Sequence, residues 1–413
     1  MKYIAILLHF YQPPTQLPEV THNITKTCYR PLSRLIQKHP RARFTVNFNY
    51  SLTEQLIQKG YTDVIDCLAQ AARSGHLEFT ESSAYHYILP LSSPEVVLDQ
   101  LERNNQGNRQ NFRQEYSPKG VFPPEMGYSP ELPKLIKGAG YQWIIADDIA
   151  LAVSRSAAPY EHVLAVNDLP VLLRSRLWSS RIGFGSTAER YQHISGNEYL
   201  AWLKHDLDAW FGPRDGYVVV ALDAETFGHH VAGYIELFLE NLLTSLDCYP
   251  DIRLCTVSDI LYHFPRREEL NLPASSWSTS EEQLAQGNPF PLWKNPRNPI
   301  HQAHWAFVEH VLALADKALT QASAATIYGV NKKRAQAQYS CQFWWANPGV
   351  FYDPGQVIRG ADMFLEIMFA LMQEHLLTVG EVSKTFNLYL ALTSQLQLSG
   401  TAEEDIRFLQ LAA

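Results

Sequence analysis

Acidic and histidine side chains follow an apolar run near the middle of the sequence. Residues 217–222 are apolar, and Asp223, Glu225, His229 and His230 come directly after them. An apolar run of this length predicts a buried β-strand. Catalytic groups of α/β barrels lie at the C-terminal ends of such strands, so the pattern indicates an active site. The alternative is that Asp223 caps a helix and the two histidines are surface loop residues.

A second carboxylate follows another predicted strand upstream. Residues 120–122 lead through Pro123 and Pro124 to Glu125. Proline restricts the backbone, so the two prolines fix the approach to Glu125. If both strands belong to one barrel, Glu125 and Asp223 face each other across its mouth. Paired carboxylates serve glycoside hydrolysis, in which one attacks or stabilises the anomeric carbon and the other protonates the leaving oxygen.

A metal site is the competing interpretation of the same side chains. His9, which ends the first apolar run, joins Asp223, His229 and His230 as a set of possible histidine and carboxylate ligands. Adjacent histidines usually point in different directions, and this turn has no helical HxxxH pair. We therefore expect no metal and no other cofactor. A metal-dependent polysaccharide deacetylase stays open as a remote alternative.

Predicted strands and helices alternate through the first two thirds of the chain, which indicates βα repeats and a parallel sheet. Roughly seven strands are expected in a barrel that ends near residue 265. The expected strands include residues 3–8, 44–49, 75–81, 120–122, 141–148, 163–174, 217–222 and 252–258. Expected helices between them include residues 52–74, 94–116, 197–211 and 234–246.

The composition changes after the barrel. Residues 266–300 are rich in proline and carry Trp277 and Trp293. A plain linker gains nothing from large apolar side chains, so this connector is expected to contribute to the active-site cleft. Residues 301–413 show helical periodicity and predict a helical bundle, with helices over 301–323, 326–345, 354–376 and 378–396.

Aromatic residues make up 12% of the chain, which suits a protein whose tryptophans and tyrosines stack on sugar rings. Trp178 lies in a stretch, 177–185, that is expected to form a loop with exposed aromatic side chains. We therefore add Trp178 and Trp293 to the candidate substrate-binding residues.

Charge and cysteine content exclude several classes of protein. With 34 basic and 42 acidic residues, the chain has no basic footprint for nucleic acid. Its 5 cysteines are spread out and contain no CxxC pair, so they predict neither a disulfide framework nor a zinc knuckle. No apolar run is long enough for a signal peptide or a membrane span, and we expect a cytoplasmic protein.

Five stretches, taken in order, resemble the motifs of glycoside hydrolase family 57. They are residues 9–13, 75–78, 122–133, 221–229 and 276–278, and residues 343–346 resemble the helical tail of that family. The resemblance implies a distorted (β/α)7 barrel followed by a C-terminal helical bundle. It also implies action on α-glucans with retention of configuration and without a metal.

Site roles follow from the same resemblance. Glu125 would be the nucleophile and Asp223 the general acid/base of a double displacement, with their carboxyl groups about 5–5.5 Å apart. The other residues that would line the sugar site are His9, Gln12, Glu78, His86, Trp277, Glu225 and His229. We expect an α-amylase-like enzyme of α-1,4-linked glucans or maltooligosaccharides. A 4-α-glucanotransferase, a branching enzyme and a non-catalytic glycan-binding protein are the alternatives.

Two residues depart from the family pattern. Tyr11 stands where the first motif usually has a second histidine, and Phe122 stands where the third motif often has tryptophan. Tyrosine cannot be cationic at neutral pH, so the electrostatics or the subsite preference is expected to differ. Because Glu125 and Asp223 are both present, we expect an active enzyme.

Overall fold

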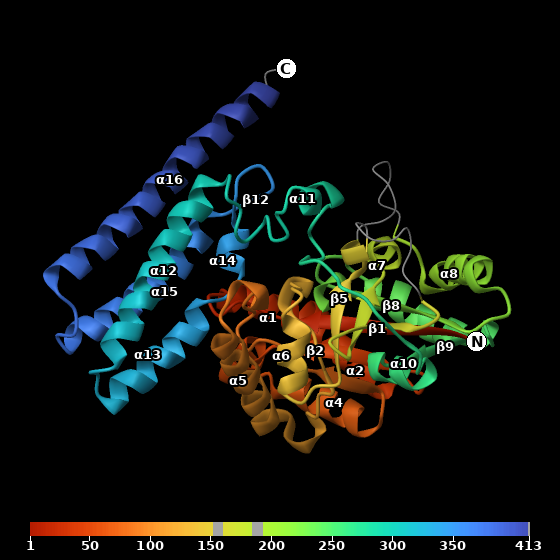
Figure 1. Ribbon diagram of the computed structural model, residues 1–413. Helices are drawn as coiled ribbons and strands as arrows, with labels where there is room; N and C mark the ends of the chain where they lie inside the picture. Colours follow the sequence, from red (N-terminus) through yellow and green to blue (C-terminus); the bar gives the residue numbers. More distant parts are fainter. Residues whose placement is uncertain (152–159, 184–192, 412–413) are drawn as a thin grey trace. The chain divides into compact units, whose positions relative to one another are not determined.

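The structure, a computed structural model, describes residues 1–151, 160–183 and 193–411 (Figure 1). The chain falls into two units that are described separately. The first contains Met1–Gln12, Gln16–Ala84 and Ile88–Ala285, and the second contains Pro13–Thr15, Tyr85–Tyr87 and Gln286–Ala413. The division between Ala285 and Gln286 falls inside the connector expected over residues 266–300.

Parallel strands form the centre of the first unit. Strand β1 (Lys2–Phe10) pairs in parallel with β2 (Phe44–Phe48) on one side and β8 (Gly216–Asp223) on the other. Seven of the described strands run in the order β3 (Leu77–Thr80), β2, β1, β8, β7 (Leu169–Arg174), β5 (Trp143–Asp147) and β4 (Gly120–Val121). A parallel bridge between Glu81 and Val121 links the two ends of this order. The expected α/β fold with a mostly parallel sheet is confirmed.

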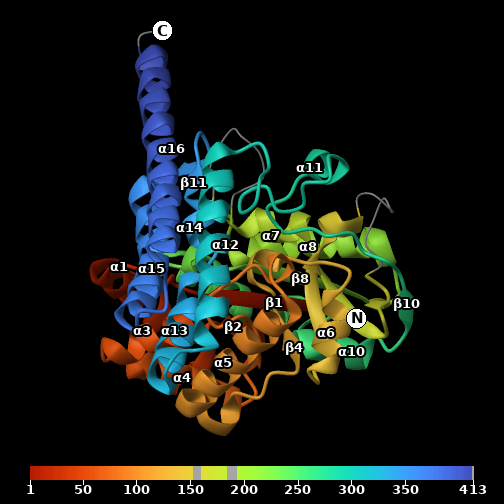
Figure 2. The same ribbon diagram turned by 60° about the vertical axis from the view of Figure 1, so that its left-hand side comes forward.

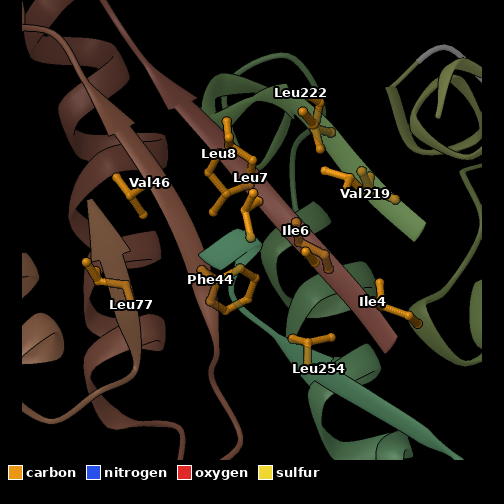
Figure 3. Close-up of a cluster of buried hydrophobic side chains, with 14 of the residues drawn as sticks. Ile4, Ile6, Leu7, Leu8, Phe44, Val46, Leu77, Val219, Leu222 and Leu254 are labelled. Carbon is orange, nitrogen blue, oxygen red and sulfur yellow. The ribbon is translucent and has the colours of Figure 1, made fainter. Parts of the chain in front are cut away.

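Strand β1 is buried along its whole length because both of its faces are covered. Successive side chains of a strand point to opposite faces, so a strand covered on both sides reads as one continuous apolar run. Figure 3 shows Ile4, Ile6 and Leu8 of β1 among side chains of the neighbouring strands, such as Val46 and Leu254. This apolar centre fixes the level at which the strands end and hence the positions of the polar groups that follow them.

Three further strands extend the sheet. β6 (Val163–Val166) pairs antiparallel with β7, β9 (Ile252–Cys255) pairs with the first half of β1, and β10 (Arg267–Glu269) pairs with β6. The stretch 163–174, in which a strand was expected, thus contains two strands, β6 and β7. Asn167 and Asp168 both have positive φ, which Asn and Asp tolerate well, and they form the turn of a hairpin.

Helices connect the strands of the first unit (Figure 1). They include α1 (Pro18–Ile24), α2 (Arg30–Lys38), α3 (Tyr50–Gln58), α4 (Thr62–Arg73), α5 (Pro94–Phe112), α6 (Leu132–Gly138), α7 (Arg176–Gly183), α8 (Gly196–Phe211), α9 (Asn241–Ser245), α10 (Val257–His263) and α11 (Glu281–Ala285).

Two expected segments of the first unit differ in the structure. The helix expected over residues 52–74 is divided, because Gly60 has a φ of +74° and ends its first half. The loop expected over residues 177–185 is helix α7 up to Gly183, and its last two residues lie outside the described residues.

The second unit is mainly helical, as expected, and a short hairpin, β11 (Ala346–Asn347) with β12 (Phe351–Tyr352), interrupts its helices. Helix α12 packs against α15 and α16, and Figure 2 shows these three long helices side by side. The unit contains α12 (Pro299–Leu319), α13 (Ala324–Ala337), α14 (Cys341–Trp344), α15 (Pro354–Gln373) and α16 (Val379–Leu411). In the described part of the chain, every helix is too short or too polar to span a membrane.

A buried carboxylate holds the bridge between β3 and β4. The backbone of Glu81 accepts a hydrogen bond from Phe122 N and donates one to Gly120 O, both at 2.8 Å. Its side chain is fully buried and accepts hydrogen bonds from four side chains at 2.6–3.1 Å. The four donors are Asn104, Asn105, Tyr116 and Tyr141. This cluster anchors the start of the segment that leads to Glu125.

Replacing Glu81 by alanine should lower the free energy of unfolding by about 3 kcal/mol, because several buried donors lose their acceptor. Chemical denaturation followed by circular dichroism measures this change. Glu19→Ala, at an exposed position of α1, is the control and should cost less than about 1 kcal/mol. Equal effects of the two substitutions would contradict the anchoring role of Glu81.

Candidate active site

His9 and Asp223 occupy the C-terminal ends of neighbouring strands. His9 of β1 lies opposite Asp223 in the pairing of β1 with β8. On the other side of β1, His9 lies opposite Asn47 of β2. The Nδ1 atom of His9 lies 2.5 Å from Oδ1 of Asn47. An amide oxygen only accepts, so Nδ1 carries the proton and Nε2 is left as the basic nitrogen. Burial lowers the pKa of His9, which favours the neutral imidazole.

Aromatic rings surround the imidazole of His9. The His9 ring stacks on Phe122, with centroids 4.9 Å apart, and on Tyr11, with centroids 5.9 Å apart. Trp277 meets His9 edge to face at 6.1 Å. The residues at positions 11 and 122 therefore form the surroundings of the same imidazole.

Glu125 sits in a strained turn after β4. It lies in the short helix η4 (Pro124–Met126) with a φ of 58°, a left-handed conformation that is uncommon for residues other than glycine. The indole N–H of Trp277 donates to Oε2 of Glu125 at 2.7 Å, and the backbone N of Trp277 donates to Glu125 O at 3.1 Å. The connector thus holds both the backbone and the carboxyl group of Glu125.

The bridge between Tyr128 and Ser275 keeps these two segments together. Tyr128 N donates to Ser275 O at 2.8 Å, and Ser275 N donates to Tyr128 O at 3.1 Å. Trp277 lies two residues beyond this bridge, so its indole is delivered to Glu125 by a paired backbone.

Glu125 and Asp223 influence each other electrostatically. Burial and then the charge of Asp223 raise the pKa of Glu125 to about 8. Burial also raises the pKa of Asp223, but His9 and Arg174 oppose this rise. The charge of Asp223 therefore favours the protonated form of Glu125 in the unliganded protein. Both side chains are partly exposed to solvent, as groups that meet a substrate must be.

Glu225 is the third carboxylate of the site. Gln12 Nε2 and the Tyr29 hydroxyl both donate to its Oε1 atom at 2.5 Å. Burial and the charge of Asp223 raise the pKa of Glu225 to about 8, while the two hydrogen bonds lower it. The Nε2 atom of His230 lies 3.8 Å from Oε2 of Glu225. The site thus holds three neighbouring carboxyl groups that cannot all be ionised at neutral pH.

The structure brings six of the predicted site residues together. Trp277 contacts Glu125 and His9, the register places His9 beside Asp223, and Gln12 binds Glu225, whose pKa responds to the charge of Asp223. His229 follows in the same turn, and its backbone N donates to Glu225 O at 3.3 Å.

Other predicted residues have different surroundings. The indole of Trp178 is fully buried in α7 and meets Tyr199 edge to face at 5.4 Å, so it is not an exposed loop residue and offers no face to a sugar. Trp293 is fully buried within the second unit. Glu78 lies two residues before the end of β3, where its Oε1 atom accepts from Thr45 and from Ser258 N, both at 2.9 Å.

His86 belongs to the second unit. It is buried, and its Nδ1 lies 2.8 Å from the hydroxyl of Ser340, while Ser340 N donates to His86 O at 3.1 Å. A structural role inside that unit accounts for these contacts. Its proposed role in sugar binding stays a prediction.

Three residues of the site were missed. Arg174 lies at the end of a predicted strand, and the rule that selected Asp223 could have selected it too, whereas Asn47 lies inside the predicted strand 44–49. Tyr29 comes from a helical segment, η1 (Thr25–Tyr29), and no sequence pattern marks it.

Two other candidates for a functional site are a metal cluster and a cavity away from the carboxylates. Within the described ranges, no group of three or more His, Cys, Asp or Glu side chains is arranged to hold a metal ion. A cavity of about 570 Å³ lies at the other ends of the strands, near the start of β1 and along β9. Its lining includes Arg41, Arg43, Arg253 and His263, but none of the three carboxylates.

A family model described as glycosyl hydrolase family 57 matches residues 7–273. The chain is 28% identical over 146 residues to alpha-amylase 1 of Dictyoglomus thermophilum and 28% identical over 141 residues to a 4-alpha-glucanotransferase of Thermococcus litoralis. These alignments cover 35% and 34% of this chain, and they span about a fifth (21%) of each relative.

Solved structures share the fold over a longer stretch. A GH57-type branching enzyme from Pyrococcus horikoshii aligns with a TM-score of 0.71 at 15% identity, covering 95% of this chain and 96% of that chain. The 4-alpha-glucanotransferase of Thermococcus litoralis aligns with a TM-score of 0.68 at 19% identity, covering 88% and 59%.

Proposed function

The chain belongs to glycosyl hydrolase family 57, and from this premise we propose that it is a retaining enzyme of α-1,4-linked glucans. It cleaves the glycosidic bond by double displacement and passes the glycosyl unit to water or to a sugar hydroxyl. The observation that carries the proposal is the pair Glu125 and Asp223, two carboxyl groups that follow β4 and end β8 and influence each other electrostatically. Double displacement requires one ionised and one protonated carboxyl group.

Glu125 is the nucleophile and Asp223 the general acid/base in this proposal. In the enzyme–substrate complex Glu125 is ionised and Asp223 carries the proton, as double displacement requires. The hydrogen bond from Trp277 supports the Glu125 anion. Asp223 then protonates the glycosidic oxygen while Glu125 attacks the anomeric carbon, and Asp223 later deprotonates the acceptor.

The neighbouring groups bind and orient the sugar. The partly exposed indole of Trp277 presents an apolar surface, while the basic Nε2 of His9 and the carboxyl of Glu225 present hydrogen-bonding atoms. The alignments with an amylase and with a glucanotransferase support an α-glucan substrate for either acceptor. No cofactor takes part in these steps.

Incubation with maltoheptaose, with and without EDTA, tests the proposal. Shorter oligosaccharides alone indicate hydrolysis, and a ladder that extends above seven glucose units indicates transfer. Proton NMR of the first products should show the α-anomer. Binding of maltoheptaose without any turnover would indicate a glycan-binding protein, and loss of activity with EDTA would favour a metal-dependent reaction.

Replacing Tyr29 by phenylalanine should lower kcat/KM on maltoheptaose about tenfold. The change removes one of the two donors to Glu225, so the pKa of Glu225 rises further and its carboxyl loses a fixed orientation. Steady-state kinetics measure the effect. Tyr249→Phe, which removes an exposed hydroxyl bonded to Asn197, should leave kcat/KM unchanged. A similar loss in both variants would argue against a role for Tyr29 in the site.

A further inference from the structure

A buried ion pair lies next to Trp277, the tryptophan of the connector that binds Glu125. Arg174, the last residue of β7, is only 8% exposed, and its Nη1 donates to Oδ2 of Asp147 at 2.6 Å. Asp147, the last residue of β5, is fully buried, and its other oxygen accepts from Ile149 N at 3.0 Å. Burying two charges is costly, and a buried pair adds little stability compared with apolar residues of the same size. Its position therefore calls for an explanation other than stability.

The guanidinium of Arg174 points to the elements that carry the catalytic groups. Its carbon Cζ lies 5.5 Å from the centroid of the Trp277 ring, in the geometry of a cation–π contact. Its Nε donates at 2.8 Å to the carbonyl of Ala221, two residues before Asp223 on β8. One planar cation thus touches the indole that binds Glu125 and the strand that carries Asp223.

We propose that Arg174, held by Asp147, is a positioning residue that supports the indole of Trp277 and sets a fixed positive charge near Asp223. This inference rests on the proposed function, because it gives Arg174 a role in that reaction. Arg174 has two separable tasks, one of shape and one of charge. The shape task is to keep the Trp277 N–H aimed at Glu125, and the charge task is to favour the Asp223 anion.

Arginine can perform both tasks, whereas lysine can perform only the charge task. The planar guanidinium stacks on an aromatic face and donates in two directions at once, here to Asp147 and to Ala221. Lysine carries the same charge on a compact ammonium group that cannot reproduce the flat contact. Arg174→Lys therefore keeps the charge and loses the shape, whereas Arg174→Met loses both.

Several charged groups surround Arg174 and Asp223. Asp147 pairs with Arg174 and also lies 3.7 Å from Nε of Arg176, and burial followed by the charge of Asp147 raises the pKa of Asp148 to about 6. The titratable groups that face Asp223 are His9, Glu125 and Glu225. Since Arg174 lowers the pKa of Asp223, its removal raises that pKa. Asp223 must be protonated to act as the acid, so the alkaline limb of kcat/KM then moves to higher pH.

The test compares pH profiles of kcat/KM on maltoheptaose for Arg174→Lys and Arg174→Met. We expect Arg174→Met to shift the alkaline limb upward by about one pH unit and to lower kcat. Arg174→Lys should leave the limb in place and lower kcat/KM about tenfold. The matched control is Arg181→Met, because Arg181 also lies over a tryptophan, Trp178 at 4.3 Å, and pairs with an aspartate, Asp206 at 3.4 Å, outside the site. The control should keep the wild-type profile.

A second readout does not need turnover. Carbon-13 NMR of labelled aspartate carboxyls, with the signal assigned by Asp223→Asn, follows the pKa of Asp223 directly. An upward shift in Arg174→Met but not in Arg174→Lys supports the inference even if the wild-type protein does not act on α-glucans, in which case only the proposed function fails. Unchanged kinetics in both Arg174 variants, or lost activity without any change in the pKa of Asp223, overturns it. If Arg174→Met does not fold, an Arg174→Lys variant with wild-type kcat/KM overturns the shape task.

Discussion

Replacing Glu125 by glutamine should reduce kcat on maltoheptaose by about 10⁴-fold or more. An amide cannot attack the anomeric carbon, and no other described carboxyl accepts the Trp277 N–H that orients Glu125. The fold should persist, because the amide oxygen still accepts that hydrogen bond. Initial rates by product chromatography measure the loss, and circular dichroism checks the fold. A variant that keeps most of its activity would show that Glu125 is not the nucleophile.

The two carboxyl roles can be separated by azide, a small anion that fills the space of a missing side chain. With Glu125→Ala, azide attacks the anomeric carbon in place of the nucleophile and yields the β-glycosyl azide. With Asp223→Ala, azide attacks the glycosyl-enzyme and yields the α-glycosyl azide, since configuration is then inverted twice. The opposite pair of products would exchange the two roles. This matters because burial and the charge of Asp223 favour the protonated form of Glu125, whereas a nucleophile must be ionised.

Glu125→Gln should also be more stable than the wild-type protein at pH 8. The pKa of Glu125 is about 8 in the folded state against 4.5 for an ordinary glutamate, so the folded protein binds a proton that the unfolded chain releases. The contribution of this group to stability is complete below pH 4.5 and is lost as the pH rises to about 8. Glutamine has no charge to bury and avoids this loss.

Differential scanning calorimetry at two pH values measures this effect. The pKa shift limits the gain to about 5 kcal/mol, and solvent at the partly exposed carboxyl reduces it to about 2 kcal/mol. We expect the melting temperature of the variant to exceed that of the wild-type protein at pH 8 and to equal it at pH 4.5. Glu19→Gln, at an exposed position, should match the wild-type protein at both. An equal gain at both pH values would exclude ionisation as its cause.

We predicted site residues from sequence by selecting polar side chains that follow the apolar residues of a predicted strand. This rule did not place every candidate residue in the site. It selected Asp223 and Glu125 because in each case the apolar residues of a buried parallel strand are followed by a carboxylate at the C-terminal end of the strand. Glu78 has the same residue type, but it lies two residues before the end of β3, and an error of that size carries a side chain away from the site. Trp178 was predicted to be exposed in a loop, but it is buried in helix α7. The apolar and polar residues of α7 show no clear helical period, so the sequence did not indicate the helix.

Contacts between distant segments could not be predicted in this way. Tyr29 reaches Glu225, and Arg174 reaches Trp277, across long separations in sequence, and only the packed fold brings them together. The hydrogen bond from His9 to Asn47 depends on the register between β1 and β2, which the apolar pattern alone does not fix to one residue. The sequence thus marked the two carboxyl groups that we propose to react, but not the groups that influence their pKa values.

The paired backbone of Tyr128 and Ser275 has a consequence for how this protein can be divided and recombined. Glu125 is oriented by a tryptophan that lies beyond the last strand pairing with β1, so the ring of strands does not hold a complete reaction centre. A hybrid enzyme that joins the barrel of one homologue to the connector of another would place a foreign indole against the reacting carboxyl. We expect such a hybrid to keep the orientation of Glu125 only if its connector supplies an indole at the position of Trp277 and the backbone pairing of Tyr128 with Ser275.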